Sequence, residues 1–136
     1  MAHFLTPMLA TSAPPLHLGR RGHGAPLATT LEPAFDSASR KRGLLQHEAL
    51  APATALLIAP CGAVHTFGMR FAIDVIFAAR DGRVVKIVPS LAPRRIAVAL
   101  KAFATVEMAA GEAARHGVSV GDYLELRSAD QLTVKQ

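Results

Sequence analysis

The sequence predicts a single compact, mainly β domain, an antiparallel sandwich or barrel with one or two short helices. Three observations support this fold class. Short apolar runs rich in β-branched residues recur at close spacing from residue 54 onward, as is typical of all-β domains. An Asp-Gly pair at 81–82 separates two of these runs, which is a strong hairpin signal. Strands alternating with full-length helices, which would indicate a parallel sheet, are absent.

The expected strands differ in length and in the strength of their signal. The run 71–79 (FAIDVIFAA) is the strongest, and 84–88 (VVKIV) is its expected hairpin partner. Pro89 and Pro93 are expected to break regular structure after that hairpin. The remaining predicted strands are 25–33, 54–59, 64–67, 103–108 and 123–127.

Two short helices are expected. The first begins near Asp36 or Ser37, because either side chain can cap a helix N-terminus. It ends or bends at Gly43, since glycine costs a helix about 1 kcal/mol relative to alanine. The second spans one or two turns within residues 109–117 and is closed by Gly117 as its C-cap.

Composition divides the chain into three parts. Residues 1–23 are rich in proline, glycine and histidine and are predicted to be a flexible leader. Residues 24–128 form the β-rich domain, and 129–136 are a polar tail. The leader lacks a basic n-region and Pro7 interrupts its apolar stretch, so we do not expect a secretory signal. We expect a cytoplasmic location, with a periplasmic or envelope-associated one as the alternative.

Charge, hydropathy and cysteine content narrow the classes of function. The net charge is +5, from 15 Lys and Arg against 10 Asp and Glu. Aromatic residues are not interleaved with the basic ones, so nucleic-acid binding is not favoured. No apolar run approaches the roughly 20 residues of a membrane-spanning helix. The single Cys excludes an intramolecular disulfide framework and a multi-cysteine metal cluster, and we predict neither a cofactor nor a metal ion.

A set of motifs resembles the domain of unknown function 192 (DUF192) family, a bacterial and archaeal group of small β-rich domains. The motifs are, in chain order, RGLL at 42–45, VHTFGM at 64–69 followed by IDVIF at 73–77, DGRVV at 81–85, EMAAG at 107–111 and GD at 121–122. Each motif alone is weak, but their common order over about residues 25–127 is specific. The resemblance implies a compact all-β domain without an established activity, and a fold alone would not assign one.

The chain departs from this family pattern at a few positions. Gly68 stands where many members carry Trp, and Ala72 stands where many carry Pro. The arrangement of Cys61 and His65 resembles a subgroup variant, so neither residue is required across the family.

Asp74 is the most informative candidate residue. In a strand with a period of two, Asp74 and Val75 point to opposite faces, and apolar neighbours on both sides predict that Asp74 is at least partly buried. A buried carboxylate needs hydrogen-bond donors or a cation, and the candidates are Arg42, His65, Arg70 and backbone amides. The favoured interpretation is a structural carboxylate that pins a loop, and the alternative is a catalytic or ligand-binding one.

Cys61 and His65 could act with Asp74 as nucleophile, base and orienting carboxylate. Four residues of extended chain span about 13 Å, so contact between Cys61 and His65 requires a turn at residues 62–63. The favoured alternative for Cys61 is a small buried apolar residue. The spacing of these three residues is not diagnostic of a metal site.

Phe67, Met69 and Arg70 lie in the same segment and, with Arg42, are candidate ligand-binding residues. A bent loop could place them as a polarisable and basic wall beside Asp74. The alternative is core packing by Phe67 and Met69 with Arg70 exposed.

The favoured function is a non-enzymatic binding or accessory protein that uses the loop around residues 61–70 for an unidentified protein or small-molecule partner. The alternative is a hydrolase or transferase that uses Asp74 and His65, with or without Cys61. An accessory role in an envelope or secretion system is a third class. Glu107 interrupts an apolar strand and is interpreted as a second structural anion.

Overall fold

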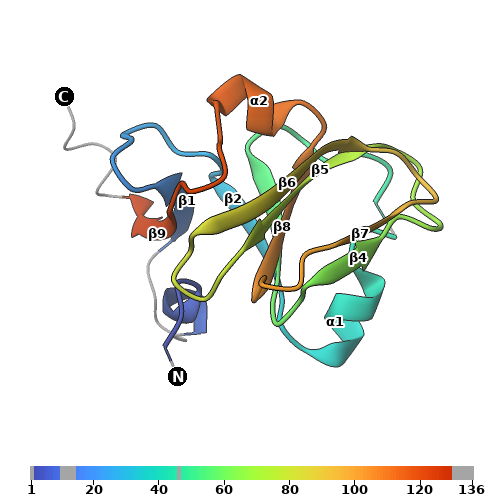
Figure 1. Ribbon diagram of the computed structural model, residues 1–136, viewed down its shortest axis with the longest axis horizontal. Helices are drawn as coiled ribbons and strands as arrows, with labels where there is room; N and C mark the ends of the chain where they lie inside the picture. The colour runs from blue at the N-terminus through green and yellow to red at the C-terminus, as the bar shows by residue number, and fades with distance from the viewer. Residues whose placement is uncertain (1, 10–14, 46, 130–136) are drawn as a thin grey trace.

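The computed structural model describes residues 2–9, 15–45 and 47–129, and it confirms the mainly β fold class (Figure 1). The central sheet has five strands: β2 (Thr30–Ala34), β3 (Thr54–Ile58), β8 (Ala104–Ala109), β5 (Ile73–Ala78) and β6 (Val84–Leu91), in this spatial order. Two two-stranded sheets accompany it: β1 (Leu16–Arg20) with β9 (Leu124–Ser128), and β4 (Ala63–His65) with β7 (Ile96–Val98). The helical elements are α1 (Ser37–Arg42), α2 (Glu112–His116) and the short 3-10 helix η1 (Thr6–Leu9).

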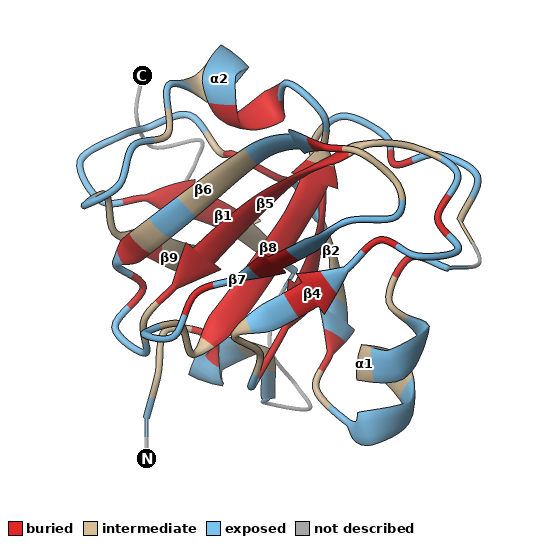
Figure 2. Ribbon diagram, turned by 45° about the vertical axis from the view of Figure 1, so that its right-hand side comes forward, coloured by how far each residue is buried: buried red, intermediate tan, exposed pale blue. Residues whose placement is uncertain are grey.

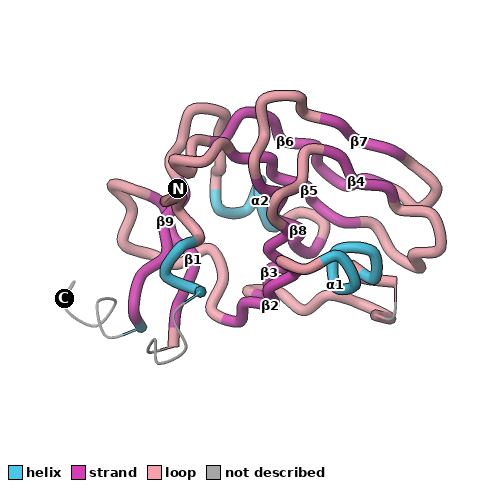
Figure 3. Tube along the Cα trace, turned by 90° about the horizontal axis from the view of Figure 1, so that it is seen from below, coloured by secondary structure: helices cyan, strands magenta, loops and turns pink. Residues whose placement is uncertain are grey.

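Both faces of the central sheet are covered, which gives the molecule its layered, sandwich-like arrangement (Figure 3). On the first face, the β1–β9 pair, the N-terminal residues and α2 pack through side chains that include Leu5 and Leu18. On the second face, the segment after α1 and the β4–β7 pair pack through Leu44 and Val64. Strands β5 and β8 lie between these layers and are buried along almost their whole length (Figure 2).

One strand pair differs from the predicted antiparallel arrangement. Strand β2 pairs with β3 in parallel, while every other strand pair among the described residues is antiparallel. A parallel pair needs a crossover connection, and α1 lies in the connection between β2 and β3. The connection from Ala34 to Thr54 is long enough for this crossover, and α1 supplies six of its residues.

The predicted hairpin between β5 and β6 is present, and Gly82 makes its turn possible. Gly82 has φ +92° and lies so close to β9 that a Cβ atom would collide with the carbonyl oxygen of Leu124. The predicted break at Pro89 is wrong, because β6 continues to Leu91. Since β6 is an edge strand, the missing N–H of Pro89 does not interrupt a ladder between two neighbours.

Both predicted helices are present, with the expected ends. The Asp36 carboxylate accepts the backbone N–H of Ser39 at 2.8 Å and caps the N-terminus of α1. Gly43 follows as the C-cap of α1, and Gly117, with φ +68°, is the C-cap of α2.

Residues 1–23 were predicted to be a flexible leader, and the structure packs part of the described residues of this segment against the first face of the sheet. Residues 16–20 form β1, and Leu5 and Leu18 are completely buried. The buried guanidinium of Arg20 donates to the carbonyl oxygens of His116 (2.6 Å) and Gly117 (3.0 Å), so β1 also caps α2. The apolar residues of this segment are few and widely spaced among prolines and glycines, so its composition did not indicate that they contribute to the core. Residues 130–136 of the predicted polar tail lie outside the described residues.

Candidate functional site

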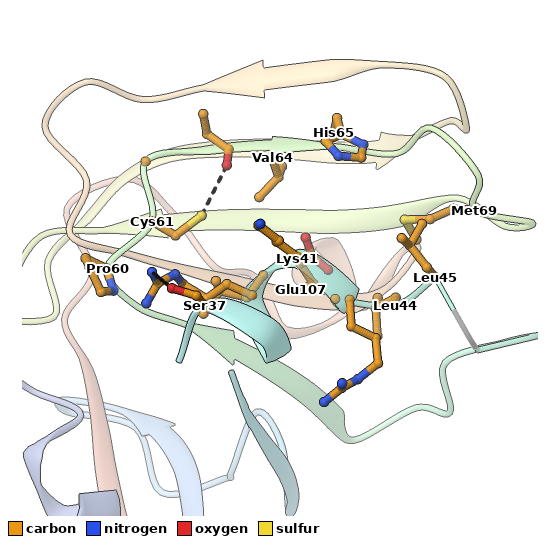
Figure 4. Close-up of a pocket in the computed structure, with 16 residues that line it drawn as sticks. Ser37, Lys41, Leu44, Leu45, Pro60, Cys61, Val64, His65, Met69 and Glu107 are labelled. Carbon is orange, nitrogen blue, oxygen red and sulfur yellow. Dashed lines mark hydrogen bonds between the residues drawn. The ribbon is translucent and has the colours of Figure 1, made fainter. Parts of the chain in front are cut away.

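A cavity of about 480 Å³ lies on the second face of the sheet. Helix α1 and strand β4 flank it, and the side chain of Glu107 reaches it from β8 (Figure 4). Its walls are largely apolar and include Leu44, Ile58 and Val64. These elements meet here because α1 and the β4–β7 pair cover the same face of the central sheet.

Glu107 is buried in this cavity with a relative exposure of 4%. It lies on the central strand β8, opposite Leu56 of β3 and Val75 of β5. Its carboxyl group has no hydrogen bond or ion pair with any residue that the structure describes. Burial among these apolar neighbours raises the pKa of Glu107 from 4.5 to about 7, because desolvation disfavours the charged form.

The interpretation of Glu107 as a structural anion therefore finds no supporting contact. The alternation of polar and apolar residues along β8 nonetheless indicates on which face of the sheet Glu107 lies. Val106 and Met108 point to the first face, where they join its apolar core. Glu107 and the buried Thr105 share the other face, so the alternation along this strand places polar groups on the side of the cavity.

Three consecutive cations of α1 line the cavity: Arg40, Lys41 and Arg42. The Arg40 guanidinium donates to the carbonyl oxygen of Phe35 at 3.0 Å. The side chains of Lys41 and Arg42 make no hydrogen bond or ion pair within the described ranges, and Figure 4 shows Lys41 directed into the cavity. Among the described residues that line the cavity, Glu107 is the only acidic one. The cavity thus combines a basic side with one buried carboxyl group.

Cys61 and His65 both line the cavity, but no hydrogen bond joins these two side chains. The Cys61 thiol donates to the carbonyl oxygen of Ala63 at 3.2 Å. The exposed His65 ring instead lies against Phe67, with ring centroids 5.8 Å apart. The structure therefore brings the two residues to one site without the nucleophile–base contact that covalent catalysis requires.

Asp74 lies outside this site. Its side chain is completely buried and accepts the backbone N–H groups of Ser90 (2.9 Å) and Ala113 (2.8 Å). Ala113 belongs to the first turn of α2, which covers the first face of the sheet. The carboxylate thus ties α2 and the end of β6 to β5, and the structure does not bring it together with His65 or Cys61.

The candidate ligand-binding residues are divided between the cavity and the surface. Arg42 and the buried Met69 line the cavity. Phe67 is half-exposed outside the cavity lining. Arg70 is exposed and forms an ion pair with Glu48 at 3.4 Å. The predicted wall beside Asp74 is therefore not formed.

Neither a metal-binding cluster nor a membrane-spanning helix is found among the described residues. No group of three or more His, Cys, Asp or Glu side chains there is placed to hold a metal ion. None of the helices in these ranges is long and apolar enough to cross a membrane.

Comparison with known proteins places this architecture in a family. No curated protein matches the chain. A crystal structure of a protein of unknown function from Novosphingobium aromaticivorans has a TM-score of 0.71 and 23% identity, covering 85% of this chain and 88% of that chain. A crystal structure from Sinorhizobium meliloti, of a protein named a "putative transcription regulator", has a TM-score of 0.70 and 24% identity, covering 81% of this chain and 90% of that one. At these identities both show the fold alone. The family model of DUF192 (uncharacterized ACR) matches residues 19–126, which confirms the resemblance seen in the sequence: the chain belongs to the DUF192 family.

Proposed function

We propose that this chain is a small-molecule-binding protein whose ligand occupies the cavity between α1 and β4. The observation that carries this proposal is the carboxyl group of Glu107, which is buried, borders the cavity and has no partner among the described residues. A buried polar group without a partner is costly to the folded state. A ligand that donates a hydrogen bond to Glu107 would satisfy it.

The dimensions and lining of the cavity support a small molecule. Ligand pockets typically measure about 300–1,000 Å³ and combine apolar walls with a few placed polar groups. The cavity of about 480 Å³ has this composition. Cys61, His65 and Met69 line it, so the loop around residues 61–70 that was predicted to bind a partner forms part of its wall. A flat protein surface would not reach the Glu107 side chain, because this residue is only 4% exposed.

A second candidate is an enzyme that uses Glu107 as a general acid or base. A carboxyl group with a pKa of about 7 suits proton transfer at neutral pH. Binding without turnover is favoured, because the Cys61 thiol donates a hydrogen bond to a backbone carbonyl oxygen and makes none to His65. A hydrolase or transferase based on Asp74 is not supported, since its carboxylate is sealed from the cavity.

A screen of compact polar metabolites by ¹H–¹⁵N NMR tests the proposal. We expect shift changes that concentrate in α1, the β3–β4 segment and the centre of β8. Lys41→Glu is expected to weaken binding of an anionic hit at least about tenfold, equivalent to about 1.4 kcal/mol. Lys101→Glu makes the same charge change at an exposed position outside the cavity and is the control.

Two results would contradict binding at this site. One is the absence of any compound that shifts these resonances, and the other is equal weakening by Lys41→Glu and Lys101→Glu. Conversion of a bound compound by the protein, abolished in Glu107→Gln, would favour the enzyme instead.

A further inference from the structure

The charges of the cavity are divided between two sides, and this division restricts the ligand. Glu107 extends from β8 of the sheet, and Lys41 extends from α1 into the same cavity, which Arg40 and Arg42 also line (Figure 4). Leu44, Ile58 and Val64 provide apolar lining. A ligand that fills this space meets an acid from the sheet, cations from α1 and apolar side chains.

A ligand that carries only a positive or only a negative charge does not complement this cavity. A simple amine could pair with Glu107, but the exposed cations Lys41 and Arg42, which line the same cavity, would repel it. A simple anion could pair with Lys41 and Arg42, but it would leave the Glu107 carboxyl group unpaired in its apolar surroundings. Burial of an unpaired carboxyl group is unfavourable, so the plain anion leaves the buried Glu107 unsatisfied.

We propose that the ligand is a compact primary amine that also carries an anionic group, with its ammonium bound to Glu107 and its anion bound to Lys41 and Arg42. This inference rests on the proposed binding function and specifies the chemical class of its ligand. An ammonium group has three donors, which match the unpaired carboxyl oxygens. The guanidinium of Arg42 and the ammonium of Lys41 are both suited to a carboxylate or a phosphate.

Binding of such a ligand is coupled to a proton. The titratable or charged groups that line the cavity with Glu107 are Arg40, Lys41 and Arg42 from α1, with Cys61 and His65 from the β3–β4 segment and β4. Strands β3 and β5 contribute the apolar Leu56 and Val75 beside it. Below the pKa of about 7, Glu107 holds a proton in the free protein. Pairing with an ammonium requires the carboxylate, so this proton is released to solvent as the complex forms.

Matched compounds separate the contributions of the two ends of the ligand. The probes are β-alanine, γ-aminobutyrate and 5-aminopentanoate, each compared with the unsubstituted carboxylic acid and the unsubstituted amine of the same chain length. Calorimetric titration in two buffers of different ionisation enthalpy gives the affinity and the number of protons released. The measurements are made about one pH unit below and about two units above the pKa of Glu107.

We expect at least one of the amino acids to bind at least about tenfold more tightly than both of its matched compounds. Binding should release close to one proton at the lower pH and almost none at the higher pH. Glu107→Gln should bind the amino acid and the plain acid equally and should release no proton. Lys41→Met should reduce binding of the amino acid more than Lys101→Met does. Because the pH dependence is measured on the wild-type protein, the test remains valid if Glu107→Gln does not fold.

The outcomes distinguish this inference from the proposed function. If a plain acid binds in the cavity as tightly as its amino acid, or if no proton is released below the pKa, the inference is wrong while small-molecule binding stands. The same conclusion follows if the metabolite screen finds only ligands without an amine. If neither the matched series nor the screen yields a ligand in the cavity, both proposals fail.

Discussion

Asp74 and Glu107 lie on adjacent strands of one sheet, and their carboxyl groups point to opposite faces. Asp74 pairs with Met108, and Glu107 pairs with Val75, the residue after Asp74. Both carboxyl groups are buried, with exposures of 0% and 4%. Asp74 accepts two backbone N–H groups, whereas Glu107 has no partner in the described part of the chain. Because neighbouring positions on a strand face opposite sides of the sheet, Asp74 is a structural carboxylate on one face and Glu107 is a candidate ligand-binding group on the other.

The burial of Glu107 predicts a specific dependence of stability on pH. Its pKa rises from 4.5 to about 7 on folding, so between these values the folded chain keeps a proton that the unfolded chain has released. The free energy of unfolding should therefore fall by about 3 kcal/mol as pH rises from about 4.5 to about 7, and then level off. Glu107→Gln resembles the protonated form and should lose this decrease.

Urea denaturation of the two proteins from acidic to mildly alkaline pH measures the effect. The pKa values of Glu112 and Asp122 are lowered, chiefly by a side-chain hydrogen bond from Arg115 and a backbone hydrogen bond from Ser119, respectively. Their stabilisation is present above their unfolded pKa values and is lost as pH falls, in both proteins alike. The difference between the two profiles therefore isolates Glu107, and parallel profiles would show that Glu107 is not desolvated.

Asp74→Asn is expected to destabilise the fold without affecting the cavity. The substitution replaces one acceptor oxygen by an NH₂ donor that faces the backbone N–H of Ser90 or Ala113. Leaving one buried donor unpaired should cost about 1–3 kcal/mol in the free energy of unfolding. Chemical denaturation measures this cost, with Asp81→Asn as the control, because Asp81 is exposed and its hydrogen-bond partner among the described residues is the backbone N–H of Arg83.

Either of two results would overturn this role for Asp74. The first is equal stability of the Asp74→Asn and Asp81→Asn variants. The second is loss of ligand binding in an Asp74→Asn protein that remains folded, since this would return Asp74 to the functional site.

The N-terminal segment is expected to contribute to stability through Leu5. This side chain is completely buried in the core of the first face, whereas Leu9 on the adjacent 3-10 helix is 56% exposed. Leu5→Ala should lower the free energy of unfolding by about 2–5 kcal/mol, because it removes buried side-chain volume and leaves a cavity. Leu9→Ala should change it by less than about 0.5 kcal/mol.

Thermal or urea denaturation of this pair decides between a packed and a flexible N-terminus. A flexible leader, as predicted from composition, would make the two variants equal in stability. A large loss in Leu5→Ala alone would show that residues before β1 belong to the folded domain.

Several features of the fold could be predicted from the sequence because they depend on short stretches of chain. The cap at Asp36, the turn at Gly82 and the C-cap at Gly117 follow from local backbone preferences. The alternation of Asp74 and Val75 follows from the period of an extended strand. The order of the motifs was sufficient to identify the family, and the family match confirms it.

Other features depended on contacts between distant segments, and only the tertiary structure decided them. Sequence alone determined that the chain forms a mainly β domain of the DUF192 family and that residues 74 and 107 are carboxylic acids within apolar strands. The tertiary structure decided that β1 joins the core, that β2 pairs in parallel with β3, and that α1 and β4 leave a cavity over Glu107. The physical reason is that strand periodicity separates the two faces of a sheet but does not specify what covers each face. The cover of the first face supplies the Ala113 N–H to Asp74, in addition to the Ser90 N–H from β6, whereas the cover of the second face leaves an open cavity at Glu107.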